Sequence, residues 1–280
     1  MWMLKQKLDV CKAVAFVTFK EWGAYRSHSM VSIFVGPVYF IVQYFIWSAV
    51  YGGAGDYSGS LQVSLNGIEL AQMIRYFGAT ALIGYLVMDF ADWNLNMLIQ
   101  SGKFLTFALR PLNHRFFAFS QKVGHRVLGF VVEFIPCFLI FTLLFKIDMR
   151  PVYLGWTIVS IILAYFMHFL VNYCLGMASF WIVQTNGLRS FYALAASIFS
   201  GMLIPLVFFP KPLQIIQFFL PFQYTSYVPA MVFLGSYSLG GIHLSIPAIV
   251  GIQAAAVVIF FVLSELIYNA AMKQFTAVGA

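Results

Sequence analysis

The sequence predicts an all-α polytopic membrane protein that forms a single domain over residues 1–280, and three observations support this fold class. Only 9% of the 280 residues are charged and 62% are hydrophobic, whereas a soluble domain carries roughly 25% charged residues. Six apolar segments have about the 20-residue length that a helix needs to cross the hydrocarbon core. Lysine and arginine are concentrated in a few connecting segments. A water-soluble fold is excluded, because the chain lacks the polar side chains to cover one.

Residues 3–24 are expected to form an amphipathic elbow helix that lies in the membrane interface. Apolar positions recur at helical spacing beside a narrow polar stripe, as in interfacial helices. The apolar stripe contains Leu4, Leu8, Cys11, Ala15, Phe19 and Trp22, and the polar stripe contains Lys5, Asp9, Lys12 and Lys20. A signal peptide fits less well, because Asp9 and Glu21 are acidic and no small-residue cleavage site follows a clean apolar run.

The six predicted transmembrane helices cover residues 31–51, 69–91, 127–146, 155–184, 190–208 and 244–271. A Gly-rich loop at 56–60 follows the first of them. Short turns near residues 148–151 and 185–189 join the third span to the fourth and the fourth to the fifth. An even number of crossings places both chain ends on the same side of the membrane.

The long segment 92–126, between the second and third spans, is too polar and too basic for the hydrocarbon region. Its charged and titratable side chains include Lys103, Arg110, Arg115, Lys122 and Arg126, with His114 and His125. If the termini are cytoplasmic, this segment is cytoplasmic as well. Twelve of the sixteen Lys and Arg residues then lie inside, three lie outside, and Arg75 lies within a span. This distribution follows the positive-inside rule, so we expect a cytosolic loop and attribute the net charge of +7 to orientation rather than to nucleic-acid binding.

Residues 209–235 are apolar enough to enter the bilayer, but prolines interrupt them. Proline removes a backbone donor and breaks a helix. The eight residues between Pro212 and Pro221 give about 12 Å of helix, which cannot span the membrane. The pattern predicts short re-entrant helices between spans five and six, which enter the outer leaflet and return.

The chain carries no sequence motif for catalysis. A phosphate-binding loop needs Gly-x-x-x-x-Gly-Lys-Ser/Thr, but Gly102-Lys103 is followed by Phe104, and Met97 stands where the first glycine belongs. Zinc-protease and nucleophile-elbow motifs are not found either, and the three cysteines have no disulfide or metal-ligand spacing. We expect no enzyme activity, no catalytic or metal site and no cofactor in this chain.

Ionisable and polar residues at membrane depth are candidates for function, because their burial is unfavourable. They are Arg75, Glu133, His168, Asn172 and Glu265. Glu133 is the preferred candidate for a packing or gating role. Asp89 and Asp92 are expected to close the cytoplasmic end of the second span. The alternative for each residue is interhelical hydrogen bonding or snorkelling, and the set is too sparse to trace a proton path.

Two stretches carry a resemblance to a known family. One is the run from Gly102 to Leu112. The other runs from Gly201-Met202-Leu203-Ile204-Pro205-Leu206 through Phe209-Pro210 and Leu220-Pro221-Phe222-Gln223 to Val228-Pro229-Ala230 and Phe233-Leu234-Gly235. In this order and spacing, the chain resembles the permease subunits of type-2 ATP-binding-cassette (ABC) exporters. It is most similar to the bacterial branch with a Leu-Arg-Pro-Leu coupling loop and a Pro-rich segment before the last span.

The resemblance implies a bacterial cytoplasmic-membrane permease with cytoplasmic termini, which forms the translocation path. It implies a second permease, identical or a sister chain, and two copies of a separate ATPase that binds ATP and Mg. A coupling helix within residues 96–118 would dock on that ATPase through Phe104, Leu105, Leu109, Arg110, Pro111 and Leu112. Gly201, Pro205, Pro210, Pro221 and Phe222 would form the gating and re-entrant region. The acidic residue usual in the family after the loop glycine is not evident near Leu105.

Two other function classes are weighed against this one. A secondary transporter or channel driven by an ion gradient would use intramembrane ionisable groups as coupling sites. An intramembrane hydrolase would need a Ser–His pair, but Ser179 and His168 lie about 16 Å apart along one helix. The sequence leaves open the cargo, the direction of transport and the identity of the second permease.

Overall fold

The structure is a computed structural model that describes residues 2–24, 26–54, 64–65, 67–109, 113–182 and 185–274. The helices are α1 Trp2–Ala24, α2 Arg26–Ala54, α3 Leu70–Val87, α4 Ala91–Gln100, α5 Leu105–Ala108, α6 His114–Gly129, α7 Ile135–Leu139, α8 Leu154–Met177, α9 Asn186–Phe199, α10 Lys211–Phe219, α11 Tyr227–Leu234 and α12 Ile246–Gln274. π-Helical turns at Phe130–Phe134 and Ile140–Leu144 flank α7, so that α6 and α7 form one long rod. The predicted all-α fold class is confirmed.

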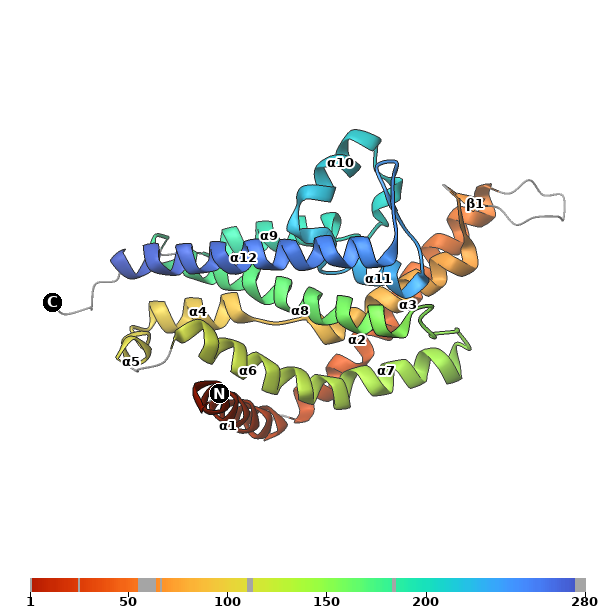
Figure 1. The fold of residues 1–280 in the computed structure, drawn as a ribbon. Coiled ribbons are helices and arrows are strands. Elements are labelled where there is room, and N and C mark those ends of the chain that lie inside the picture. The colour runs from red at the N-terminus through yellow and green to blue at the C-terminus, as the bar shows by residue number, and fades with distance from the viewer. Residues whose placement is uncertain are drawn as a thin grey trace.

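The long helices pack side by side. Figure 1 shows α12 (blue) lying along α8 (green), with α4 and the α6–α7 rod on the other side of α8. The α5 turn and the C-terminal end of α12 lie at one end of the bundle, and β1 lies at the other (Figure 1). Two small antiparallel hairpins pair β1 Ser64–Leu65 with β2 Ile68–Glu69 and β3 Tyr237–Leu239 with β4 Ile242–Leu244. Short 3₁₀ helices cover Ala178–Phe180, Leu206–Phe208 and Pro221–Tyr224.

Five helices in the described parts of the chain are long and apolar enough to cross a membrane. They cover Val31–Gly52, Leu70–Gln100, His114–Leu144, Leu154–Phe180 and Ile246–Gln274. The fifth span expected over 190–208 is a shorter helix, because α9 ends at Phe199 after 14 residues. That length gives about 21 Å of helix, against about 30 Å of hydrocarbon. The chain turns at Gly201, whose φ is +80°, and the helix does not resume before Pro205.

Most of the polar segment 92–126 is helical rather than a loop. The second long helix continues through α4 to Gln100, and the third begins at His114, so the connection shortens to residues 101–113, which include the short α5. The expectation of a loop rested on charge density. Several of these charges instead have partners in other helices, including Asp92 with Arg189 and Arg115 with Glu265.

The N-terminal helix predicted over 3–24 is present as α1, and it packs against α6. The packed face differs in part from the predicted apolar stripe, since Thr18 is buried while Leu8 is 53% exposed. Gly124 permits this contact, because a Cβ built there would lie 2.2 Å from the carbonyl oxygen of Ala15.

Gly124→Ala is therefore expected to push α1 away from α6 and to lower the free energy of unfolding by about 1–3 kcal/mol, the usual range for overpacking. Backbone atoms of Ala15 oppose the new methyl group, so no flexible side chain can move aside. The thermal midpoint in detergent measures the effect. Gly84→Ala is the matched control, since a Cβ there meets nothing within 4 Å; equal midpoints for the two variants would contradict the close contact.

The Pro-rich segment 209–235 forms the two expected short helices, α10 and α11, separated by the 3₁₀ turn Pro221–Tyr224. All residues of α11 up to Phe233 are buried, and α11 packs against α3 and α8. Tyr227, the first residue of α11, is fully buried. This helix is therefore part of the core, while α10 lies outside the bundle of long helices (Figure 1).

Candidate functional site

The second long helix is broken between α3 and α4, at Met88–Phe90. Asp89 Oδ1 accepts a hydrogen bond from the backbone N–H of Ala91 at 2.7 Å, which starts α4. Asp92 Oδ2 lies 2.6 Å from Nε of Arg189 on α9. Both carboxylates are buried. They were expected at the end of the span, but they lie inside it at a break that links α3, α4 and α9.

Arg126 of α6 lies beside this break. Its guanidinium donates to the carbonyl oxygen of Tyr85 in the last turn of α3. The same nitrogen, Nη1, lies 3.9 Å from Glu133 Oε2, and the two side chains are 9% and 13% exposed. Glu133, the preferred candidate for packing or gating, thus faces a buried arginine that also holds α3.

The other predicted intramembrane charges have separate partners. Arg75 donates from Nε to the carbonyl oxygen of Asp148 at 3.0 Å and from Nη2 to that of Arg150 at 2.8 Å. Arg115 Nη2 lies 2.6 Å from Glu265 Oε2, joining α6 to α12. Arg75 thus joins α3 to the segment that follows the α6–α7 rod, and Arg115 joins α6 to α12.

His168 and Asn172 lie one turn apart on α8, as predicted. Asn172 is buried, and its Nδ2 lies 3.5 Å from the carbonyl oxygen of Asp89 at the helix break. His168 is half-buried. Asn172 therefore adds α8 to the helices that meet at the break.

The α5 turn, which we define as the described residues 101–109 that follow α4, contains three of the six predicted ATPase-coupling residues. Phe104 is only 1% exposed, and its ring centroid lies 5.0 Å from that of His114 and 5.1 Å from that of Phe180. Leu105 and Leu109 are 38% and 78% exposed. Phe104 is thus an internal anchor, and the two leucines present the free apolar surface. Arg110, Pro111 and Leu112 lie outside the described residues.

The predicted gating region lies where α9 ends. The Tyr76 hydroxyl donates to the carbonyl oxygen of Gly201 at 2.7 Å. The Phe222 ring centroid lies 5.7 Å from that of Tyr192 and 6.1 Å from that of Phe199, so it packs against α9. Pro205 is buried, whereas Pro210 is exposed and Pro221 is half-buried. Pro210 and Pro221 stand at the starts of α10 and of the following 3₁₀ turn.

A buried glutamine network, which the sequence reading missed, ties this region to α8 and α12. Gln253 Nε2 donates to the carbonyl oxygens of Tyr224 at 2.9 Å and Ser160 at 3.1 Å. Tyr237 donates to Gln223 Oε1 at 2.8 Å, and burial raises the pKa of the Tyr237 phenol, which keeps it protonated. The signal in the sequence was a glutamine within an apolar helix, where an amide needs a partner.

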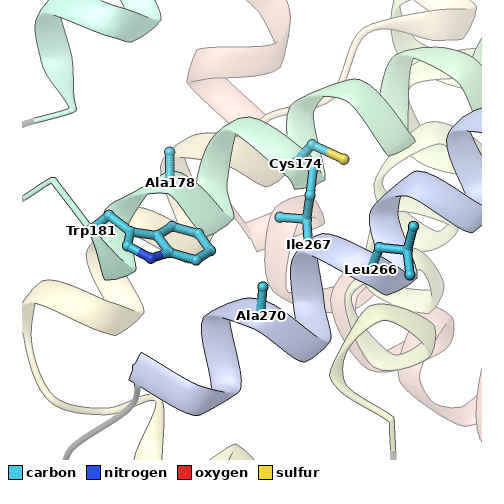
Figure 2. Close-up of a pocket in the computed structure, with 6 residues that line it drawn as sticks. All are labelled: Cys174, Ala178, Trp181, Leu266, Ile267 and Ala270. Carbon is cyan, nitrogen blue, oxygen red and sulfur yellow. The ribbon is translucent and has the colours of Figure 1, made fainter.

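The described surface has an apolar groove and a larger, more polar cavity. Figure 2 shows the smaller one, an apolar groove of about 440 Å³ between α8 and α12, with Cys174 and Trp181 on one wall and Leu266 on the other. The larger one, of about 640 Å³, is lined by side chains of α1, α4, α6 and α9 and by Phe90. Within the described residues, no group of three His, Cys, Asp or Glu side chains is arranged to hold a metal ion.

The comparisons with known proteins give one match. Neither the curated proteins nor the solved structures contain a match to this chain. A family model described as ABC-2 family transporter protein matches residues 37–279, which include the Pro-rich segment and the long helices, except for α1 and the start of α2. The chain therefore belongs to the ABC-2 transporter family and is a multi-pass membrane permease without catalytic chemistry of its own.

Proposed function

We propose that this chain is the membrane half of an ATP-driven exporter and that a separate ATPase docks on the α5 turn. The observation that carries the proposal is the form of this turn. It joins two long helices, its Phe104 is anchored inside the chain, and Leu105 and Leu109 are exposed. An apolar, anchored projection at the end of a bundle is a suitable contact for a partner that moves.

The anchoring of Phe104 supplies a route for movement. Its ring contacts His114 at the start of α6 and Phe180 in the 3₁₀ turn that follows α8. A displacement of α5 would therefore be transmitted to α6 and to the end of α8 through these ring contacts, and to α4 through the backbone. The break at residues 88–90 separates α4 from α3 and would absorb a change of angle between them, as hinges do.

The proposed assembly contains two permease chains, identical or sisters, and two ATPase copies that bind ATP and Mg. ATP binding and hydrolysis would shift the permease pair between inward-open and outward-open states. The basic segments and the family resemblance support a bacterial cytoplasmic membrane, with the α5 end and both termini in the cytoplasm and cargo moving outward. The position of α5 at the same end as the C-terminal end of α12 is consistent with this orientation (Figure 1).

A transporter driven by an ion gradient is the competing function, and the geometry favours it less. Such a mechanism needs carboxylates that exchange protons or ions. Glu265 is bound by Arg115 at 2.6 Å, and Glu133 faces Arg126 at 3.9 Å. Each of these carboxylates already has an arginine as its ionic partner, so neither is an open site for a coupling ion.

The proposal is tested by Leu109→Glu in a membrane preparation that also contains the ATPase recovered with the wild-type chain. Leu109 is 78% exposed, so the substitution leaves the fold intact. It places a charge in an apolar contact, and we expect ATPase recovery to fall about tenfold, the effect of roughly 1.4 kcal/mol at the interface.

Ile242→Glu is the matched control, because Ile242 is also exposed but lies on the β4 strand. Recovery of the ATPase with this control should equal the wild-type value. Undiminished recovery with Leu109→Glu, at equal amounts of inserted chain, would place the docking surface elsewhere. Uphill transport by the chain reconstituted alone, driven by an ion gradient, would overturn the proposed function itself.

A further inference from the structure

The larger cavity, of about 640 Å³, combines aromatic walls with buried positive charge. The aromatic walls are Trp22 from α1, Phe90 from the helix break and Trp93 from α4. Lys122 from α6 and Arg189 from α9 supply the positive charges, and Glu21 of α1 is the carboxylate on the rim. The lining of the cavity therefore offers both apolar surface and cationic groups to a ligand.

Lys122 is the unusual member of this set. Its side chain is 6% exposed, yet its ammonium makes no hydrogen bond or close ion pair with any residue that the structure describes. Asp89 and Asp92 attract it only from a distance. Asp92 is held by Arg189 at 2.6 Å, whereas Asp89 Oδ1 accepts from the backbone of Ala91 and its buried Oδ2 has no hydrogen-bond partner among the described residues. The Lys122 ammonium is not among the fully enclosed side-chain atoms without a partner, so it faces the open space of the cavity and offers its three donors there.

The cavity opens beside the helix expected to lie in the membrane interface. On α1, Phe16 and Val17 are 58% and 63% exposed, and Lys12 and Lys20 are exposed on the same helix. Trp93, on the wall of the cavity, is 44% exposed. Tryptophan is enriched at the level of lipid head groups, and basic pockets between transmembrane helices bind anionic lipid heads.

We propose that this cavity binds the anionic head group of a membrane lipid. The head-group phosphate accepts hydrogen bonds from Lys122, and the glycerol and upper acyl region lie against Trp22, Phe90 and Trp93. Bound lipid would join α1 to the break between α3 and α4, and thereby couple lipid composition to the segment proposed to bend. The binding site itself does not depend on ATPase docking, so it is testable on this chain alone.

The test uses the full chain in detergent, titrated with a short-chain phosphatidylglycerol, with the matching phosphatidylcholine and with inorganic phosphate. A ligand that binds the folded state raises the thermal midpoint. We expect a rise with phosphatidylglycerol that is absent with phosphatidylcholine and with phosphate. Lys122→Gln should weaken the phosphatidylglycerol effect about five- to ten-fold in midpoint concentration, the usual effect of removing one cation from an anionic lipid site.

Two further variants keep the test decisive. Trp93→Ala changes an exposed side chain on the wall and should also weaken lipid binding, even if Lys122→Gln proves unstable. Lys12→Gln removes an exposed lysine of α1 that does not line the cavity and should leave binding unchanged. Equal stabilisation by phosphatidylcholine, equal stabilisation by inorganic phosphate, or an equal loss of lipid binding in Lys12→Gln would each overturn the proposal. It would also fail if Lys122→Gln lowered the midpoint but left the lipid-dependent rise unchanged.

Discussion

Arg126→Gln is expected to destabilise the chain by about 3 kcal/mol, which is the lower end of the range for removing one partner of a buried ion pair. The arginine is 9% exposed and lies between the carbonyl oxygen of Tyr85 and the carboxylate of Glu133. Glutamine carries no charge and does not reach both groups. The largely enclosed carboxylate of Glu133 would lose its ion pair with Arg126, and α3 would lose a hydrogen bond in its last turn.

A double substitution separates the charge effect from simple loss of packing. Glu133→Gln in the Arg126→Gln background should restore part of the thermal midpoint, because the Glu133 charge that lost its partner is then removed. Arg150→Gln is the control, since the Arg150 side chain lies on the exposed surface and its loss should change stability by less than about 0.5 kcal/mol. If the losses caused by Arg126→Gln and Glu133→Gln simply add, the two residues are not coupled, and the role assigned to their pairing would be rejected.

The elements that the sequence predicted correctly are those specified by local patterns. The spacing of apolar residues predicted α1, and the prolines at 210, 212, 221 and 229 predicted the short helices α10 and α11. Both signals act over a few residues. Apolar spacing sets the direction in which side chains of a helix point, and proline ends a helix because it has no backbone N–H to donate. The resemblance to ABC-2 permeases depended on the order of short motifs, and the family match over residues 37–279 bears it out.

The errors arose where distant contacts decide the structure. Charge density indicated a loop over 92–126, but Arg115 and Asp92 are paired with residues in α12 and α9, so the helices continue. Phe104 was expected on a docking surface, yet its contacts with His114 and Phe180 bury it. The helix break at Asp89 follows from no local signal except the aspartate itself. Such contacts join positions far apart in the sequence, and periodicity contains no information about them.

At the end of α9, contacts of Gly201 with Tyr76 and Tyr227 also decide the structure, since the helix ends there although the apolar sequence predicts a longer span. Gly201→Ala is expected to lower the free energy of unfolding by about 2–4 kcal/mol, from left-handed backbone strain and from overpacking. The φ of Gly201 is +80°, and a Cβ there would lie 2.7 Å from the Tyr76 hydroxyl oxygen and 3.1 Å from Tyr227 Cδ2. Because Tyr227 is fully buried and starts α11, the loss should extend to the packing of the Pro-rich segment.

Gly187→Ala, in the first turn of the same helix, is the matched control for this prediction. A Cβ at Gly187 meets nothing within 4 Å, so this variant should be neutral or more stable by up to about 1 kcal/mol. Tyr76→Phe removes the hydroxyl that opposes the new methyl group, so Gly201→Ala should cost less in that background than in the wild type. If it costs the same, the Tyr76 contact contributes nothing, and backbone strain together with the Tyr227 contact explains the loss. Equal thermal midpoints for Gly201→Ala and Gly187→Ala would show that the turn at Gly201 does not require glycine, and α9 would then be free to continue as the longer span that its apolar sequence predicts.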